Sequence, residues 1–96
     1  MSPAVLILGR HDGMMQQVLS FLGNHGFHKT KGVLTNDAVQ KELISNQYQI
    51  LIIGGGVDAD TRAIIRGLIA THQLSIKVIE HYGNPTGLIR QIERAM

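Results

Sequence analysis

Three polar residues that could do chemistry follow one another in the segment GRHDG, directly after the first apolar run. They are Arg10, His11 and Asp12. A guanidinium can hold a phosphate through two hydrogen bonds, and an imidazole beside a carboxylate can act as a general base or accept a phosphoryl group. Simpler interpretations also fit, because Asp12 suits the N-cap of a following helix and His11 suits a solvated loop. Both interpretations stay open.

Three consecutive glycines, Gly54, Gly55 and Gly56, stop another apolar run and precede two acidic residues. Glycines let backbone N–H groups approach an anion at the start of a helix, where the helix dipole assists. However, the spacing matches neither of the common phosphate-binding glycine motifs, and Asp58 and Asp60 would repel a phosphate. The alternative is a strand-to-helix turn that needs a positive φ or close packing.

A third polar group, which includes His81 and Asn84, follows the last apolar run. His81 and His11 would lie at the same edge of a sheet if each follows a strand. With Glu80 or Asp58, the two imidazoles would offer nitrogen and oxygen ligands, but no His-x-His or His-x-x-x-His spacing supports a metal site. The chain also contains no complete catalytic set. We therefore expect no metal, no cofactor and no catalytic residue.

The composition is that of a small globular domain, and we expect one domain over residues 1–96. The chain is 44% hydrophobic and 17% charged, which argues against disorder. Its charges are scattered, and an aromatic content of 4% offers little for base stacking, so we expect no nucleic-acid partner. The absence of cysteine, and of apolar runs long enough for a signal peptide or a membrane span, predicts a cytoplasmic protein without membrane contact.

Two kinds of apolar pattern alternate along the chain. Short runs rich in Val, Ile and Leu predict strands at residues 4–8, 27–34, 50–53 and 76–79. Helical spacing predicts four helices, beginning near Asp12, at Thr35 or Asn36, at Asp58 or Asp60, and at Asn84 followed by Pro85. The predicted core-facing helix positions are Met14, Met15, Val18, Leu19, Leu22, Val39, Leu43, Ile44, Ala63, Ile64, Leu68, Ile69, Leu88, Ile89, Ile92 and Met96.

Four β-α units in succession predict a three-layer α/β/α sandwich, with a parallel sheet and right-handed crossovers. Residues 27–34 mix polar and apolar side chains and include Gly32, as an edge strand does, so the predicted strand order is 2-1-3-4. Ligands bind such sheets at the carboxyl ends of the strands where the order reverses, here between strands 1 and 3. The candidate ligand-binding residues are therefore Arg10, His11, Asp12, Gly54, Gly55, Gly56, Asp58, His81 and Asn84.

The segments VLILGR, FLGNHGF and NDAVQKELISNQYQILIIGG resemble the receiver domain of bacterial response regulators, within the flavodoxin-like class. The resemblance covers about residues 4–80. In that family the first strand ends in an acidic pair and the third in a phosphorylated aspartate. Here Gly9 and Arg10 replace the pair and Gly54 replaces the aspartate, and the chain has four β-α units where a receiver has five.

The resemblance therefore implies a degenerate, non-catalytic receiver-like module that cannot be phosphorylated in the usual way. Such a signalling module would act through a protein partner, including self-association as a homodimer. The edge strand at residues 76–80 is the candidate for pairing with a second copy.

A shorter segment, GRHDGMMQQVL, resembles the loops after strand 1 in components of the sugar phosphotransferase system. In those proteins a Cys or a His carries a phosphoryl group. Arg10 stands where the cysteine would be, so only a version carried by His11, with Asp12 orienting it, is left. The alternative function is therefore the binding of an anion, phosphate or nucleotide, or a His-based phosphoryl carrier.

Overall fold

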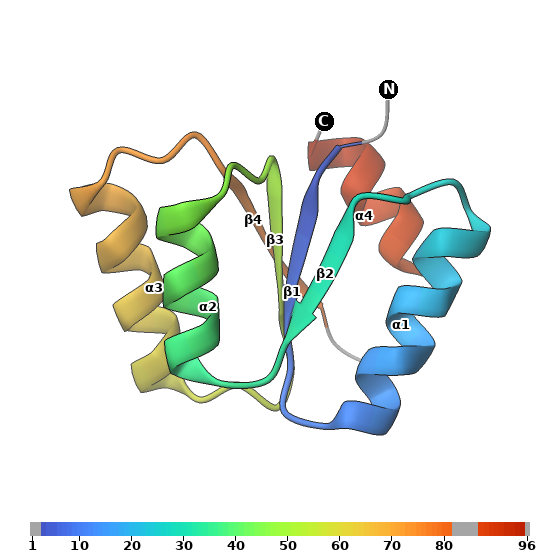
Figure 1. Ribbon diagram of the computed structural model, residues 1–96, viewed down its shortest axis with the longest axis horizontal. Helices are drawn as coiled ribbons and strands as arrows, with labels where there is room; N and C mark the ends of the chain where they lie inside the picture. The colour runs from blue at the N-terminus through green and yellow to red at the C-terminus, as the bar shows by residue number, and fades with distance from the viewer. Residues whose placement is uncertain (1–2, 82–86, 96) are drawn as a thin grey trace.

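Strands and helices alternate through the residues that the computed structural model describes, 3–81 and 87–95 (Figure 1). The elements are β1 (Val5–Leu8), α1 (Asp12–Asn24), β2 (Thr30–Val33), α2 (Asn36–Ser45), β3 (Ile50–Gly54), α3 (Ala59–Thr71), β4 (Lys77–His81) and α4 (Leu88–Ala95). All neighbouring strands are parallel, and their order is β2-β1-β3-β4. The predicted strand order is therefore confirmed.

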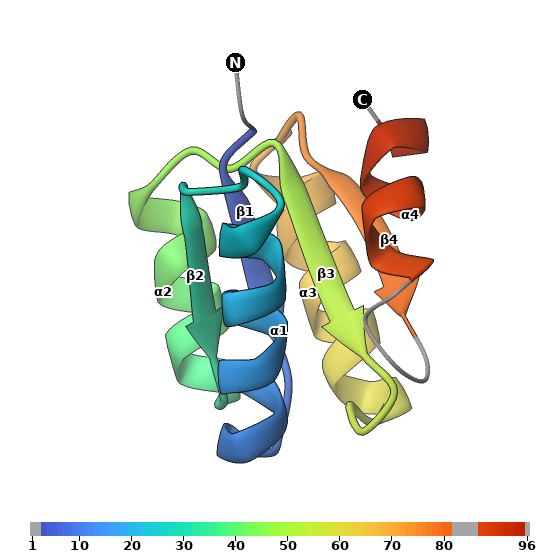
Figure 2. The same cartoon turned by 90° about the vertical axis from the view of Figure 1, so that its right-hand side faces the viewer.

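The sheet forms the middle layer of a flavodoxin-like α/β sandwich. Helices α2 and α3 cover one face, and α1 and α4 cover the other (Figure 1). Figure 2 views the second face, where α1 lies in front of the sheet beside β2 and α4 lies against β4. The predicted three-layer architecture is confirmed.

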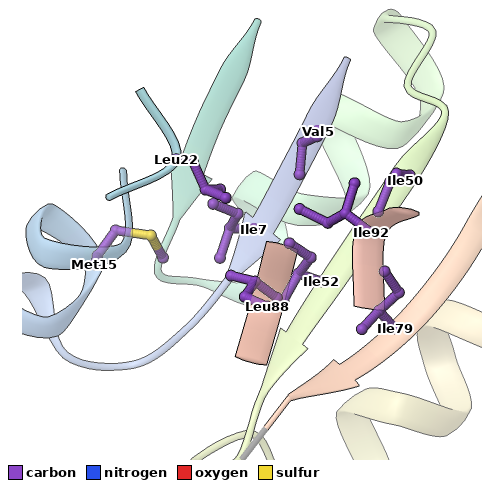
Figure 3. Packing of buried hydrophobic residues seen from close by; sticks show 9 residues of the cluster. All are labelled: Val5, Ile7, Met15, Leu22, Ile50, Ile52, Ile79, Leu88 and Ile92. Atoms are coloured by element: carbon purple, nitrogen blue, oxygen red, sulfur yellow. The ribbon is translucent and has the colours of Figure 1, made fainter. Parts of the chain in front are cut away.

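Strands β1 and β3 are buried on both faces, which explains their uninterrupted Val, Ile and Leu sequences. Alternate side chains enter two separate cores. The core under α1 and α4 contains Val5, Ile7, Met15, Leu22, Ile50, Ile52, Ile79, Leu88 and Ile92 (Figure 3). The core under α2 and α3 contains Leu6, Leu8, Val33, Val39, Leu43, Leu51, Ile53, Val57 and Ile65. Full burial of each Ile or Leu contributes roughly 1.5–3 kcal/mol to folding.

Edge strand β2 is shorter than the predicted run at 27–34, since it spans only Thr30–Val33. Its Gly32 faces α1, and a Cβ atom there would overlap the thioether of Met15. Gly32 therefore makes room for a core side chain of α1, in addition to lying on an edge. At the other edge, β4 begins and ends later than predicted, at Lys77 and His81.

The observed helix starts decide between the predicted N-cap residues and show that one of these predictions is wrong. Asp12 is the first residue of α1, so its prediction as N-cap is wrong; His11 takes that position without a side-chain cap hydrogen bond. In the first turn the Asp12 carboxylate still interacts favourably with the helix dipole. Thr35 caps α2 and Asp58 caps α3. The predicted cap of α4 at Asn84, with Pro85, lies outside the described residues, as does Met96.

Some predicted core-facing helix positions are wrong. Met14 is 57% exposed and Ile44 is 59% exposed, because each lies one position beyond the face that contacts the sheet. Ala63 and Ile64 of α3 are also exposed. The buried positions there are Thr61 and Ile65. Thr61 can be buried because its hydroxyl group has hydrogen-bond partners inside the protein.

Candidate ligand pocket

A pocket of about 450 Å³ lies at the carboxyl ends of β1 and β3, on the face covered by α1 and α4. This is the point where the strand order reverses and where the topology predicts a ligand site. The lining comes from residues 7–11, from the first turns of α1, from the end of β3 with the three glycines, and from His81 and Leu88. Its volume falls within the range of small-molecule sites, roughly 300–1,000 Å³.

The pocket brings together most of the residues selected from the sequence. Arg10, His11, Gly54–Gly56 and His81 all contribute to its wall. Asp12 and Asp58 do not belong to its lining. Asn84 lies outside the described residues.

Arg10 directs its guanidinium group towards α2 and α3. One terminal nitrogen donates to the carbonyl oxygen of Leu34 at 2.8 Å. The other donates to Oδ1 of Asn36 and, at 3.2 Å, to Oγ1 of Thr61. Thr61 in turn donates from Oγ1 to Asn36 at 3.2 Å. Arg10 therefore joins the loop after β1 to the first turns of two helices, and its terminal nitrogens already have acceptors within the protein.

Asp58 acts as a helix cap. Its carboxylate accepts a hydrogen bond of 3.3 Å from the backbone nitrogen of Thr61. The hydrogen bond from Thr61 lowers the pKa of Asp58 below its ordinary value, and the charge of Arg10, 4.0 Å away, acts in the same direction. The exposed carboxylate thus stabilises the start of α3.

Backbone strain does not explain the glycines at positions 54 and 56. Neither Gly54 nor Gly56 has a positive φ. A Cβ atom at Gly54 would lie 3.4 Å from the carbonyl oxygen of Leu8, and one at Gly56 would lie 3.9 Å from Cβ of Arg10, both ordinary contacts. The predicted need for positive φ or close packing therefore does not account for these two residues. Their effect is to leave this part of the pocket wall without side chains.

Arg62, which the sequence analysis did not select, holds the turn that contains the glycines. Its terminal nitrogens donate to the carbonyl oxygens of Val57 at 2.6 Å and Gly54 at 3.3 Å. Its Nε atom lies 2.7 Å from the carboxylate of Glu80, which also accepts from Arg66 at 3.2 Å. Arg62 and Arg66 are four residues apart on α3, a spacing that places both side chains on the same face of the helix.

His81 is oriented by α4. Its Nδ1 atom lies 2.7 Å from Oε1 of Gln91, while Nε2 of Gln91 donates to the carbonyl oxygen of Glu80 at 3.3 Å. Because the amide nitrogen of Gln91 is a donor there, its oxygen accepts, and we assign the proton of the His81 ring to Nδ1. Adjacent strand residues point to opposite faces, so His81 faces α4 whereas Glu80 faces α3. These two residues therefore do not form a shared metal site.

The fold and the pocket define a flavodoxin-like α/β domain with a small-molecule-sized cavity at its switch point. Comparisons with protein families, with curated proteins and with solved structures find no match to the chain. The receiver resemblance thus stays a prediction from the sequence. Within residues 3–81 and 87–95, no helix has the length and apolar character needed to cross a membrane. The same part of the chain contains no group of three or more residues placed to hold a metal ion.

Proposed function

We propose that this chain is a non-catalytic, receiver-like regulatory module that acts through protein contacts and is not phosphorylated in the usual way. The observation that carries the proposal is the chemistry at the ends of β1 and β3. Gly9 follows β1 and Gly54 ends β3, and no Asp or Glu occurs among the described residues that line the pocket. An aspartyl-phosphate needs a carboxylate nucleophile, and the Mg²⁺ that assists it needs oxygen ligands.

The position of Arg10 supports the same proposal. In the receiver pattern this position is acidic, whereas here it holds a guanidinium that bonds to Leu34, Asn36 and Thr61. The alternative function, anion binding or phosphoryl transfer, has less support, because a phosphate at the pocket would compete with these acceptors for Arg10. A cytoplasmic signalling role is part of the proposal.

The strand order offers a surface for a protein partner. β4 is the last strand of the sheet and pairs only with β3 in the described residues. The outer side of an edge strand is where a strand of a second copy can add through backbone hydrogen bonds. We therefore include homodimer formation through β4 in the proposal.

Treatment with acetyl phosphate and Mg²⁺, followed by intact-mass spectrometry, tests the catalytic part of the proposal. The proposal predicts that the mass stays that of the unmodified chain. A mass increase of one phosphoryl group would contradict it. The variants His11→Asn and His81→Asn then locate the acceptor, because loss of the label in one of them assigns it to that imidazole and supports the alternative function.

A further inference from the structure

The pocket at the carboxyl ends of β1 and β3 has walls of two different kinds. Apolar side chains from both central strands and both covering helices form most of it, among them Ile52, Met15, Val18 and Leu88. The remaining wall includes the backbone of the glycine segment 54–56 and the polar side chains of Arg10, His11, Gln17 and His81. A body of aliphatic or aromatic atoms would therefore bury apolar surface against the strands and helices and also contact peptide groups of the glycine segment.

The electrostatic character of the lining limits the charge of a ligand. Arg10 is the only Lys, Arg, Asp or Glu among the described lining residues, and its guanidinium bonds to acceptors at α2 and α3. An ionised ligand entering this cavity would lose hydration without gaining a dedicated counter-charge, which is costly. A neutral molecule avoids this cost.

Polar groups at the carboxyl end of the pocket can still orient a neutral ligand. The His81 ring is fixed by Gln91 at 2.7 Å, and His11 and Gln17 also line the cavity. Backbone groups of the glycine segment add further donors and acceptors. These groups favour a ligand that carries one neutral hydrogen-bonding function, such as an amide, beside its apolar body.

From this combination we infer that the pocket binds a small uncharged organic molecule with an apolar body and a hydrogen-bonding end. Met14 lies in the lining and is 57% exposed, so its flexible thioether side chain forms part of the entrance. Neither Gly54 nor Gly56 is required as glycine by φ or by neighbouring atoms. The space that they leave is thus available to a ligand. The inference does not depend on the proposed function, since it concerns binding alone.

Titration of the ¹⁵N-labelled chain with indole-3-carboxamide, benzamide and cyclohexanecarboxamide at millimolar concentrations tests the inference. We expect saturable amide shifts at the glycine segment and at Gly9 with at least one of these probes. The matched anion indole-3-carboxylate and inorganic phosphate are expected to bind at least about tenfold more weakly, because the lining lacks an available counter-charge. Absence of saturable shifts with all three amides overturns the inference, as does equal or tighter binding of either anion at these residues.

Matched variants establish whether the probe occupies this cavity. Val18→Phe fills the interior, and Met14→Glu places a carboxylate at the entrance. We expect each to weaken probe binding by at least about tenfold. Ile44→Glu is the control, because Ile44 is a similarly exposed helix residue, at 59%, and does not line the pocket. Equal affinities in Met14→Glu and Ile44→Glu would overturn the assignment, even if Val18→Phe failed to fold.

Discussion

The guanidinium of Arg10 and the hydroxyl of Thr61 are 3.2 Å apart, although 51 positions separate them in the sequence. This contact joins the loop after β1 to the first turn of α3. Asn36 accepts from both residues, so α2 belongs to the same hydrogen-bond network. At the edge of the sheet where related folds carry out chemistry, a basic side chain therefore serves to hold three elements together.

Substitution of Arg10 by alanine is expected to lower the stability of the protein. The change removes the donors to Leu34 and Asn36 and leaves part-buried acceptors with fewer partners, which costs about 1–3 kcal/mol. Urea denaturation followed by circular dichroism measures the difference. Arg90→Ala, on an exposed site of α4, serves as the control and should change stability by less than about 0.5 kcal/mol. Equal stability of the two variants would show that the network does not hold these elements together.

Alanine substitutions at two glycines are expected to differ in their effect on stability. In Gly32→Ala the new methyl group overlaps Met15, so we expect a loss of about 1–3 kcal/mol. In Gly56→Ala the methyl group meets only ordinary contacts, and the stability should stay within about 0.5 kcal/mol of the parent. Thermal denaturation of both variants measures the contrast. A strongly destabilised Gly56→Ala would mean that the glycine segment is required by the backbone, which would remove one argument for a ligand site.

The free energy of unfolding is expected to fall at alkaline pH because of Tyr48. Burial, together with the hydrogen bond of 2.6 Å to Glu42, raises the pKa of Tyr48 to about 12 from an ordinary value of 10.0. Between these two values the unfolded chain loses the phenolic proton while the folded chain keeps it, so the unfolded state is favoured increasingly as the pH rises. Urea denaturation from pH 9 to about 12 should show this decline and a weaker one in Tyr48→Phe. Identical pH profiles would contradict the assignment.

Edge strand β4 is expected to support self-association. Light scattering at increasing protein concentration should show a mass that rises from 10.5 kDa for one chain towards twice that value. Backbone pairing along an edge does not require side-chain charges, so the association should persist in high salt. A mass of one chain at every concentration would remove self-association from the proposed function and leave only other protein partners.

Much of the architecture could be predicted from the sequence, because buried parallel strands and amphipathic helices have different periods. The runs that contain Val5–Leu8 and Ile50–Ile53 predict central strands, because every residue in them is apolar. The polar residues Thr30 and Lys31 predict that β2 lies at an edge. The location of the pocket then follows from strand order alone. The face of a helix that contacts the sheet is predicted less well. In α3 the buried stripe includes the polar Thr61, so apolar spacing predicts Ile64 as a core residue instead of Ile65.

The roles of side chains within the site could not be predicted in the same way. Whether Arg10 faces a ligand or Asn36 depends on contacts between residues distant in the sequence. Likewise, nothing local to Gln91 indicates that it orients His81, or that Arg62 holds the turn after β3. These pairings arise from tertiary packing, and the residue types alone allow several of them.

The central claim is that the carboxyl edge of the sheet neither binds nor transfers phosphoryl groups. Thermal denaturation in the presence of inorganic phosphate, sugar phosphates and nucleotides tests this claim most directly. A ligand that binds only the folded protein raises its melting temperature with concentration. Because Arg10 bonds to protein acceptors and Gly54 carries no nucleophilic side chain, the account predicts no concentration-dependent rise with any of these compounds. A rise of several degrees that tracks concentration and disappears in Arg10→Ala would contradict the account and establish an anion site.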